Sequence, residues 1–222
     1  MLRRFLKSLG YSWKRFRKSL KKEQDPEEYE RKKAELKQLI ALYKSGYIDL
    51  FFADASGFNL EGYVPYGWQP KGEYITITPK KTKSTQVFGL LSLDNELKAY
   101  TLEGSMDSAA VIAFIDDFHA SIKKQTVVVI DNAPIHRSKK MLAKIEQWKE
   151  DDLYIFFLPK YSPHLNPIEI LWRMMKYQWL PYEEVQHQEQ LNQMIDNILC
   201  NFGTEYTIDF KEHPQKVSNI FV

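Results

Sequence analysis

Three acidic residues stand where carboxylates could hold divalent metal ions. Asp54 ends the strand-like run 47–53, Asp131 directly follows the run 126–130, and Glu169 opens an apparent helix after a third such run. Carboxylates that converge at one sheet edge repel one another unless a cation neutralises them, and oxygen ligands suit Mg²⁺ or Mn²⁺. Two such ions can activate a nucleophile and stabilise the leaving oxygen of a phosphodiester. These acids therefore predict a two-ion site for phosphodiester chemistry.

Glu169 also has a structural interpretation. Asn166 is a good N-cap, Pro167 suits the first helical position, and Glu169 is then the third. A glutamate at that position can close a capping box by bonding back to the start of the helix. From this stretch alone, helix capping and metal binding are equally good interpretations of Glu169.

Hydrophobic patterns predict the elements that must position these acids. We expect strands over 47–54, 74–78, 86–93, 97–102, 126–130 and 153–158, and helices starting at Asp25, Asp107, Ser138 and Asn166, with a last one over 191–202. The run 126–130 lacks polar alternation and is predicted to be a central strand, and 153–158 to be a buried one.

The order of these elements predicts an α/β protein. Three sequential strands favour an antiparallel meander, and later strands joined through helices favour parallel pairing. The expected architecture is a mixed central sheet flanked by helices, which is the order of a ribonuclease H-like fold. We expect residues 1–24 to form a basic helical arm, 25–46 a linker helix, 47–202 the catalytic domain and 203–222 a tail.

Composition excludes several classes of protein. The 222 residues are 44% hydrophobic and 27% charged, which is ordinary for a globular protein. A single cysteine, Cys200, excludes a disulfide or zinc framework within one chain. No apolar run approaches the length of a membrane span, and the N-terminus lacks the pattern of a signal peptide. We therefore expect a cytoplasmic protein without a membrane partner.

The net charge of +2 hides a basic arm. Residues 1–22 hold nine Lys or Arg and no acid, which leaves 22 basic and 29 acidic residues in the remainder. A basic arm with interleaved aromatics favours contact with nucleic acid over a merely solvated tail. The candidate DNA contacts are Arg3, Arg4, Lys14, Arg15, Arg17, Lys18, a predicted turn with Lys80, Lys81 and Lys83, and Arg173 and Lys176 after Glu169.

Five further residues near the acids can be interpreted from their positions. His136 could orient a phosphate or a carboxylate, or could bond a backbone carbonyl as a turn residue. Asn132, next to Asp131, could hold the same loop. Trp172 is interpreted as a core residue, and a solvated helix face remains the default for Arg173 and Lys176.

Two blocks carry a family resemblance. VVVIDNAPIHRSKK and FFLPKYSPHLNPIEILWRMMK resemble the catalytic domain of bacterial insertion-sequence transposases of the mariner superfamily, the DDE transposases. The resemblance covers about Leu2 to Leu180 and implies that Asp54, Asp131 and Glu169 are the metal-binding triad. The first block, FFADASGF, departs from the commoner Asp-Glu pair by having Ala55.

The resemblance also implies an activity and partners. A metal-activated water would cut double-stranded DNA at the terminal inverted repeats, and the freed 3′-hydroxyl would attack target DNA, usually at TA. Such proteins act as homodimers or larger synaptic assemblies, and a bacterial one would associate with the nucleoid when bound to DNA. Two alternatives stay open, namely a structure-selective nuclease of the same fold and a non-catalytic DNA-binding remnant.

Family members usually carry two helix-turn-helix units before the catalytic domain. LRRFLKSLGYSWKRFRKSLKK resembles only the end of the second unit. The resemblance therefore implies either a shortened copy or one of two reading frames, with the product of an upstream frame as a partner.

Overall fold

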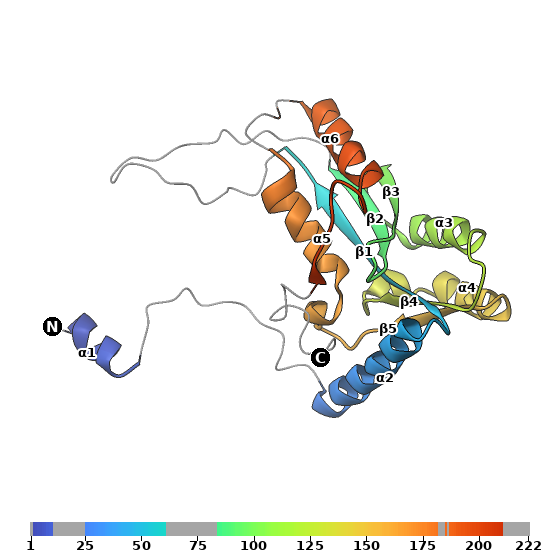
Figure 1. Ribbon diagram of the computed structural model, residues 1–222, viewed down its shortest axis with the longest axis horizontal. Coiled ribbons are helices and arrows are strands. Elements are labelled where there is room, and N and C mark those ends of the chain that lie inside the picture. Colours follow the sequence, from blue (N-terminus) through green and yellow to red (C-terminus); the bar gives the residue numbers. More distant parts are fainter. Residues whose placement is uncertain (1, 11–24, 61–83, 182–184, 186, 211–222) are drawn as a thin grey trace.

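A five-stranded mixed sheet forms the centre of the computed structural model, which describes residues 2–10, 25–60, 84–181, 185 and 187–210 (Figure 1). Its strands are β1 Asp49–Phe58, β2 Thr85–Leu91, β3 Leu97–Glu103, β4 Thr126–Ile130 and β5 Leu153–Phe157, in the order β3-β2-β1-β4-β5. β1, β2 and β3 are antiparallel neighbours, whereas β4 is parallel to both β1 and β5. The predicted meander and the predicted parallel strands are confirmed.

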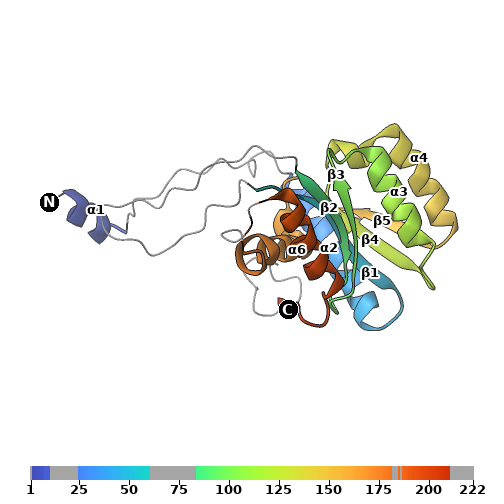
Figure 2. The ribbon, with the colours of Figure 1, turned by 90° about the horizontal axis from the view of Figure 1, so that it is seen from above.

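Helices cover both faces of the sheet (Figure 2). α3 Ser108–His119 and α4 Lys139–Glu150 lie on one face, and α2 Pro26–Lys44, α5 Ile168–Met174 and α6 Gln188–Cys200 lie on the other. Because successive strand residues point to opposite faces, β1 serves both cores. Phe51 and Ala53 pack with α3 and α4, whereas Leu50 and Phe52 pack with the other three helices.

The predicted helix starts follow from local capping chemistry. Asp25 accepts backbone hydrogen bonds from Glu27 and Glu28 at the start of α2. Asp107 caps α3 through the Ala110 N–H, and Ser138 caps α4 through the Met141 N–H. These side chains satisfy donors that the first helical turn leaves without partners. A separate short helix, α1 Leu2–Ser8, stands where the first residues predict one.

Two strand predictions need correction. β1 does not end at Asp54 but continues to Phe58, because residues 55–58 keep pairing with β2 after β4 has ended. β5 is not a buried strand, since it is an edge strand and Tyr154, Ile155, Phe156 and Phe157 are only partly buried. The predicted strand 74–78, the turn with Lys80, Lys81 and Lys83, and the arm 11–24 lie outside the described residues.

No helix among the described residues is both long and apolar enough to span a bilayer.

Candidate active site

Asp54 and Asp131 lie at the same level of two parallel neighbours. The β1–β4 register pairs Phe52 with Val129, and continuing it by two residues brings Asp54 level with Asp131. Phe52 and Val129 pack in the core beneath α5. Asp54 and Asp131 also line one pocket together with Glu169 of the helix α5. Asp54 therefore lies level with the carboxyl end of the parallel strand β4, as expected, although its own strand β1 continues beyond it.

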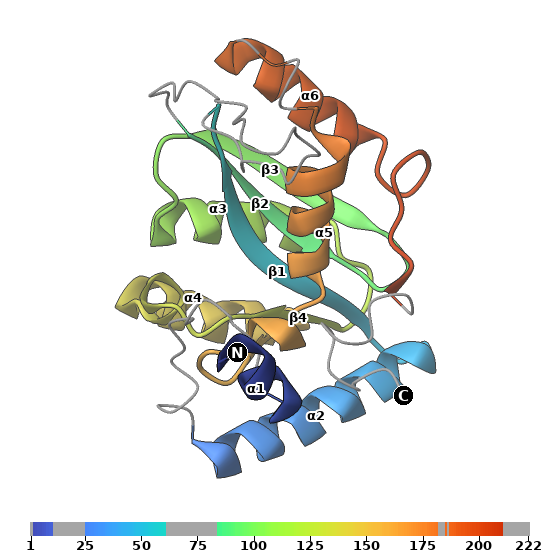
Figure 3. The same ribbon diagram turned by 90° about the vertical axis from the view of Figure 1, so that its left-hand side faces the viewer.

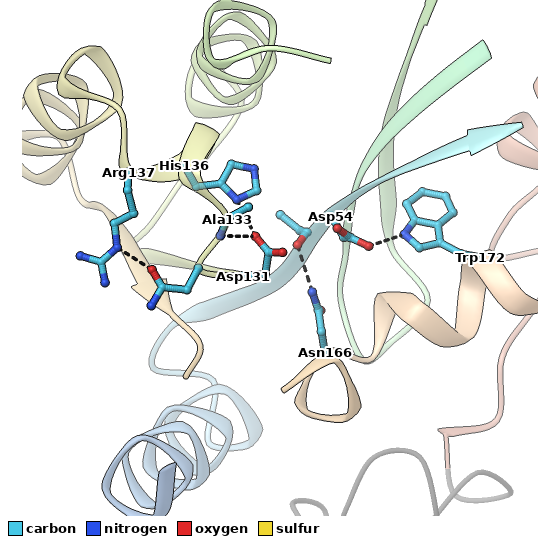
Figure 4. A network of polar contacts seen from close by, with 9 residues as sticks. Asp54, Asp131, Ala133, His136, Arg137, Asn166 and Trp172 are labelled. Carbon is cyan, nitrogen blue, oxygen red and sulfur yellow. Dashed lines mark hydrogen bonds and ion pairs between the residues drawn. The ribbon is translucent and has the colours of Figure 1, made fainter. Parts of the chain in front are cut away.

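Asp131 is held by its own loop (Figure 4). Its Oδ1 accepts a hydrogen bond of 3.0 Å from the Ala133 N–H and lies 2.7 Å from His136 Nδ1. An ionised carboxylate can only accept, so the imidazole donates from Nδ1. The loop enters the 3-10 turn η2 Pro134–Arg137, which buries His136 and leaves the Asp131 side chain half exposed.

Arg137 is fixed at the outer side of this loop. Its Nε donates to Asn132 Oδ1 at 2.7 Å, and its guanidinium carbon lies 4.4 Å from the centroid of the Phe157 ring. Figure 4 shows the guanidinium directed away from Asp131. The arrangement holds a guanidinium on the loop that follows Asp131, and no ion pair between Arg137 and a carboxylate occurs among the described residues.

Glu169 stands in the first turn of α5, and its side chain is exposed beside buried neighbours. The predicted Asn166 cap is wrong. The turn η3 Pro163–Leu165 precedes the helix, Pro167 takes the cap position, and no side chain caps α5. The Asn166 side chain instead donates from Nδ2 to the Ala53 carbonyl at 3.1 Å, because it is buried against β1 rather than turned toward the helix end. Figure 3 shows α5 lying across the sheet.

The three acids line one pocket of about 410 Å³. Asn132, Asn166 and the segment 158–163, which includes Lys160, complete its wall. Within the described residues, no three acidic, histidine or cysteine side chains lie close enough to enclose a metal ion as they stand. The carboxylates therefore face a shared space without forming a closed ligand cage.

The pocket shifts the pKa values of the three acids in different directions. Burial, and then the charges of Glu169 and Asp131, raise the pKa of Asp54 to about 7. Although the residue as a whole is exposed, desolvation of the Glu169 carboxyl against the pocket wall raises its pKa, and the charge of Lys176 opposes that effect. For Asp131, burial is outweighed by the hydrogen bonds from His136 and Ala133, which hold its pKa below the usual range. The metal-free pocket thus crowds negative charge that a cation would relieve.

Residues 49–192, which include all three acids, match the family model described as DDE superfamily endonuclease. The chain belongs to the DDE endonuclease superfamily. Over 179 residues it is 26% identical to an insertion element IS630 uncharacterized 39 kDa protein of Shigella sonnei, covering 78% of this chain and 50% of that protein. The chain therefore spans about half the length of this curated relative.

Solved structures share the fold of this chain. A Mos1 strand transfer complex aligns with a TM-score of 0.63 and 15% identity, over 99% of this chain and 65% of that one. A Mos1 mariner paired end complex with Mn aligns with a TM-score of 0.64 and 14% identity, over 99% and 66%. The expected ribonuclease H-like fold and the resemblance to insertion-sequence and mariner transposases are confirmed.

The three acids that line the pocket fit a hard divalent cation as ligands. Three carboxylates supply only oxygen ligands, and the pocket leaves room for water, which Mg²⁺ and Mn²⁺ retain in such sites. The raised pKa values of Asp54 and Glu169 arise partly from nearby carboxylates, a cost that a bound cation removes. Asp54, Asp131 and Glu169 are therefore the residues that would hold it.

Only some of the basic residues predicted to contact DNA belong to the described part of the chain. Arg4 is exposed on α1, and Arg3 belongs to the same helix. Arg173 lies on α5, and Lys176 lies on its π-helical continuation Met175–Trp179, with Nζ 5.2 Å from the Phe58 ring centroid. Both are partly buried rather than on a solvated face. The other predicted basic residues, Lys14, Arg15, Arg17, Lys18, Lys80, Lys81 and Lys83, lie outside the described residues.

Two residues at the site were not anticipated in their roles. Trp172, expected in the core, is buried and also donates from Nε1 to Asp54 Oδ2 at 3.0 Å. Arg137 was not singled out, although it stands in the same block as Asp131 and His136. Spacing could place Trp172 near Glu169 on one helix, but no sequence signal indicates which strand that helix covers.

Proposed function

We propose that this chain is the catalytic part of a DNA transposase, which hydrolyses phosphodiester bonds at element ends and transfers the freed strand into target DNA at TA. The observation that supports this most is the lining of one pocket by Asp54, Asp131 and Glu169. The Mos1 relatives in strand transfer and paired end complexes share its fold. This function requires Mg²⁺ or Mn²⁺, and we propose two ions.

The proposed chemistry divides between the cations and the chain. Bound divalent ions would polarise the attacked phosphate and lower the pKa of water. The chain supplies the carboxylates and fixes their orientation, with His136 holding Asp131 and Trp172 holding Asp54. His136 is thereby proposed as an orienting residue, and Asn132 as the residue that fixes Arg137.

The substrate is proposed to be double-stranded DNA. Arg137 places a fixed guanidinium on the Asp131 loop, where a planar donor can bind a phosphate through two hydrogen bonds. The basic arm 1–24 would bind DNA as a remnant of a helix-turn-helix region, with 25–46 as linker, 47–202 as catalytic domain and 203–222 as tail. The active unit is proposed to be a homodimer or larger assembly on paired ends, with the product of an upstream reading frame as a further partner.

The test is a cleavage and joining assay on duplex DNA carrying the element's inverted repeats, with a TA-containing plasmid as target and Mg²⁺ present. Wild-type protein should cut the ends and join them to the plasmid, whereas Asp131→Asn and Glu169→Gln should do neither. Cutting without joining would indicate a structure-selective nuclease. DNA binding without cutting in wild type would indicate a non-catalytic remnant.

A further inference from the structure

Trp172 connects the two elements that carry Asp54 and Glu169. Its indole N–H donates to Asp54 Oδ2 at 3.0 Å, and the side chain is only 3% exposed. Trp172 lies three residues after Glu169, so both project from adjacent turns of one helix. One hydrogen bond therefore joins the β1 carboxylate to the helix of the third acid.

The sheet is shaped to admit this indole. Gly89 of β2 pairs with Asp54 across the antiparallel ladder. A Cβ at Gly89 would lie 3.0 Å from Trp172 Cη2 and 3.1 Å from Ile168 Cδ1, which is closer than side chains normally pack. The absence of a side chain at this position lets α5 approach the sheet until Trp172 reaches Asp54.

A second bond fixes α5 beside the same residue. Asn166 Nδ2 donates to the carbonyl of Ala53, directly before Asp54, at 3.1 Å. The Phe58 ring meets the Trp172 ring edge-on, with centroids 6.2 Å apart. The start of α5 and its second turn are thus both tied to β1, on either side of Asp54.

We propose that Trp172 is a positioning residue for the metal site, an inference that rests on the function proposed above. In Figure 4 one Asp54 oxygen meets the indole and the other lies on the side of Asp131. The indole thereby selects which oxygen is left to bind a cation, and it sets the position of Glu169 relative to Asp54. Groups that orient metal ligands commonly change metal affinity 10–100-fold when removed.

Trp148 provides a matched control. It is 1% exposed, and its Nε1 donates to Asp116 Oδ1 at 2.7 Å. Both tryptophans are therefore buried indoles bonded to an aspartate, but Trp148 packs with α3 on the opposite face of the sheet. If Trp172 served only in packing, Trp172→Phe and Trp148→Phe would have the same effect on Mg²⁺ affinity.

The experiment compares Trp172→Phe and Trp148→Phe. Mg²⁺ affinity is measured by calorimetric titration of the DNA-free protein, and cleavage of end DNA is measured as a function of Mg²⁺ concentration. Trp172→Phe should weaken Mg²⁺ binding roughly tenfold and raise the Mg²⁺ requirement of cleavage equally. Trp148→Phe should leave both unchanged at a comparable loss of thermal stability.

A further variant covers the case in which Trp172→Phe does not fold. Gly89→Ala keeps the indole but displaces it, and should weaken Mg²⁺ binding in the same direction. Equal Mg²⁺ affinities for Trp172→Phe, Trp148→Phe and wild type would overturn the inference while leaving the proposed function intact. A wild-type protein that binds Mg²⁺ but does not cut DNA would refute the proposed function, and the titrations would still decide the role of Trp172.

Discussion

His136 and Asp131 form a pair in which a buried imidazole holds a half-exposed carboxylate, with 2.7 Å between Nδ1 and Oδ1. The other ring nitrogen, Nε2, is buried and has no hydrogen-bond partner within the described residues. A buried polar atom without a partner costs free energy. This cost arises on a ring whose other nitrogen, Nδ1, orients Asp131, a proposed metal ligand.

Removal of this imidazole should therefore affect the metal site more than the fold. His136→Ala frees Asp131 to turn, and Mg²⁺ affinity should fall by roughly tenfold or more. Calorimetric titration measures the change, and His119→Ala is the control because its imidazole contacts the Asp151 carbonyl and does not line the pocket of the three acids. Unchanged Mg²⁺ affinity in a folded His136→Ala protein would show that the pair has no orienting role.

Asp54 should make the metal-free protein less stable as the pH rises. An aspartate in an unfolded chain ionises near pH 4, whereas the pKa of Asp54 in the fold is about 7. Between these values the folded state binds more protons, so its free energy of unfolding falls with rising pH.

Asp54→Asn removes this contribution. As the pH rises between these two pKa values, the free energy of unfolding of this variant should increase relative to that of wild type by up to about 1.4 kcal/mol per pH unit. Denaturant titrations in chelator at about pH 5 and about pH 8 bracket most of that window. The same stability difference at both pH values would mean that Asp54 ionises normally in the fold.

Metal binding should in turn depend on pH. A cation must displace the proton that Asp54 retains up to about pH 7, so binding releases protons. Mg²⁺ should therefore raise the melting temperature more above that pH than below it. Asp54→Asn has no carboxylate at this position to ionise, so it should reduce the Mg²⁺-induced rise in melting temperature both above and below that pH. A larger shift at low pH would contradict the assignment of Asp54 as a ligand.

Arg137 should contribute to DNA affinity through a phosphate. Loss of one phosphate contact weakens binding across sequences and reduces the slope of log affinity against log salt by about 1. Arg137→Ala should show both effects in a fluorescence anisotropy titration. Lys144→Ala removes the same charge from α4, where Lys144 is paired with Asp116 of α3, and should leave the slope nearly unchanged. Identical salt slopes for the two variants would exclude a specific contact by Arg137.

Local chemistry was sufficient to predict much of the fold. The β-branched run 126–130 forms β4 with the predicted bounds, and Asp107 and Ser138 cap helices as their spacing indicates. In each case the deciding interactions lie within a few residues of one another. Side-chain periodicity and capping report such interactions directly.

The wrong predictions concern contacts between distant segments. Asn166 has the local features of a cap, but a buried bond to Ala53, 113 residues away, takes its side chain instead. Asp54 was placed at a strand end because its apolar run stops there, whereas pairing with β2 continues the strand. The bond from Trp172 to Asp54 depends on the space above Gly89, which no local pattern reveals.

We propose that Asp54, Asp131 and Glu169 share the cations that act on DNA. Anomalous diffraction from crystals of the protein with a DNA end and Mn²⁺ tests it most directly, because Mn²⁺ can be located independently of the protein atoms. We expect anomalous peaks between these three carboxylates and the scissile phosphate, and their loss in Asp131→Asn. Mn²⁺ bound elsewhere, in a crystal in which the DNA end has been cut, would contradict it.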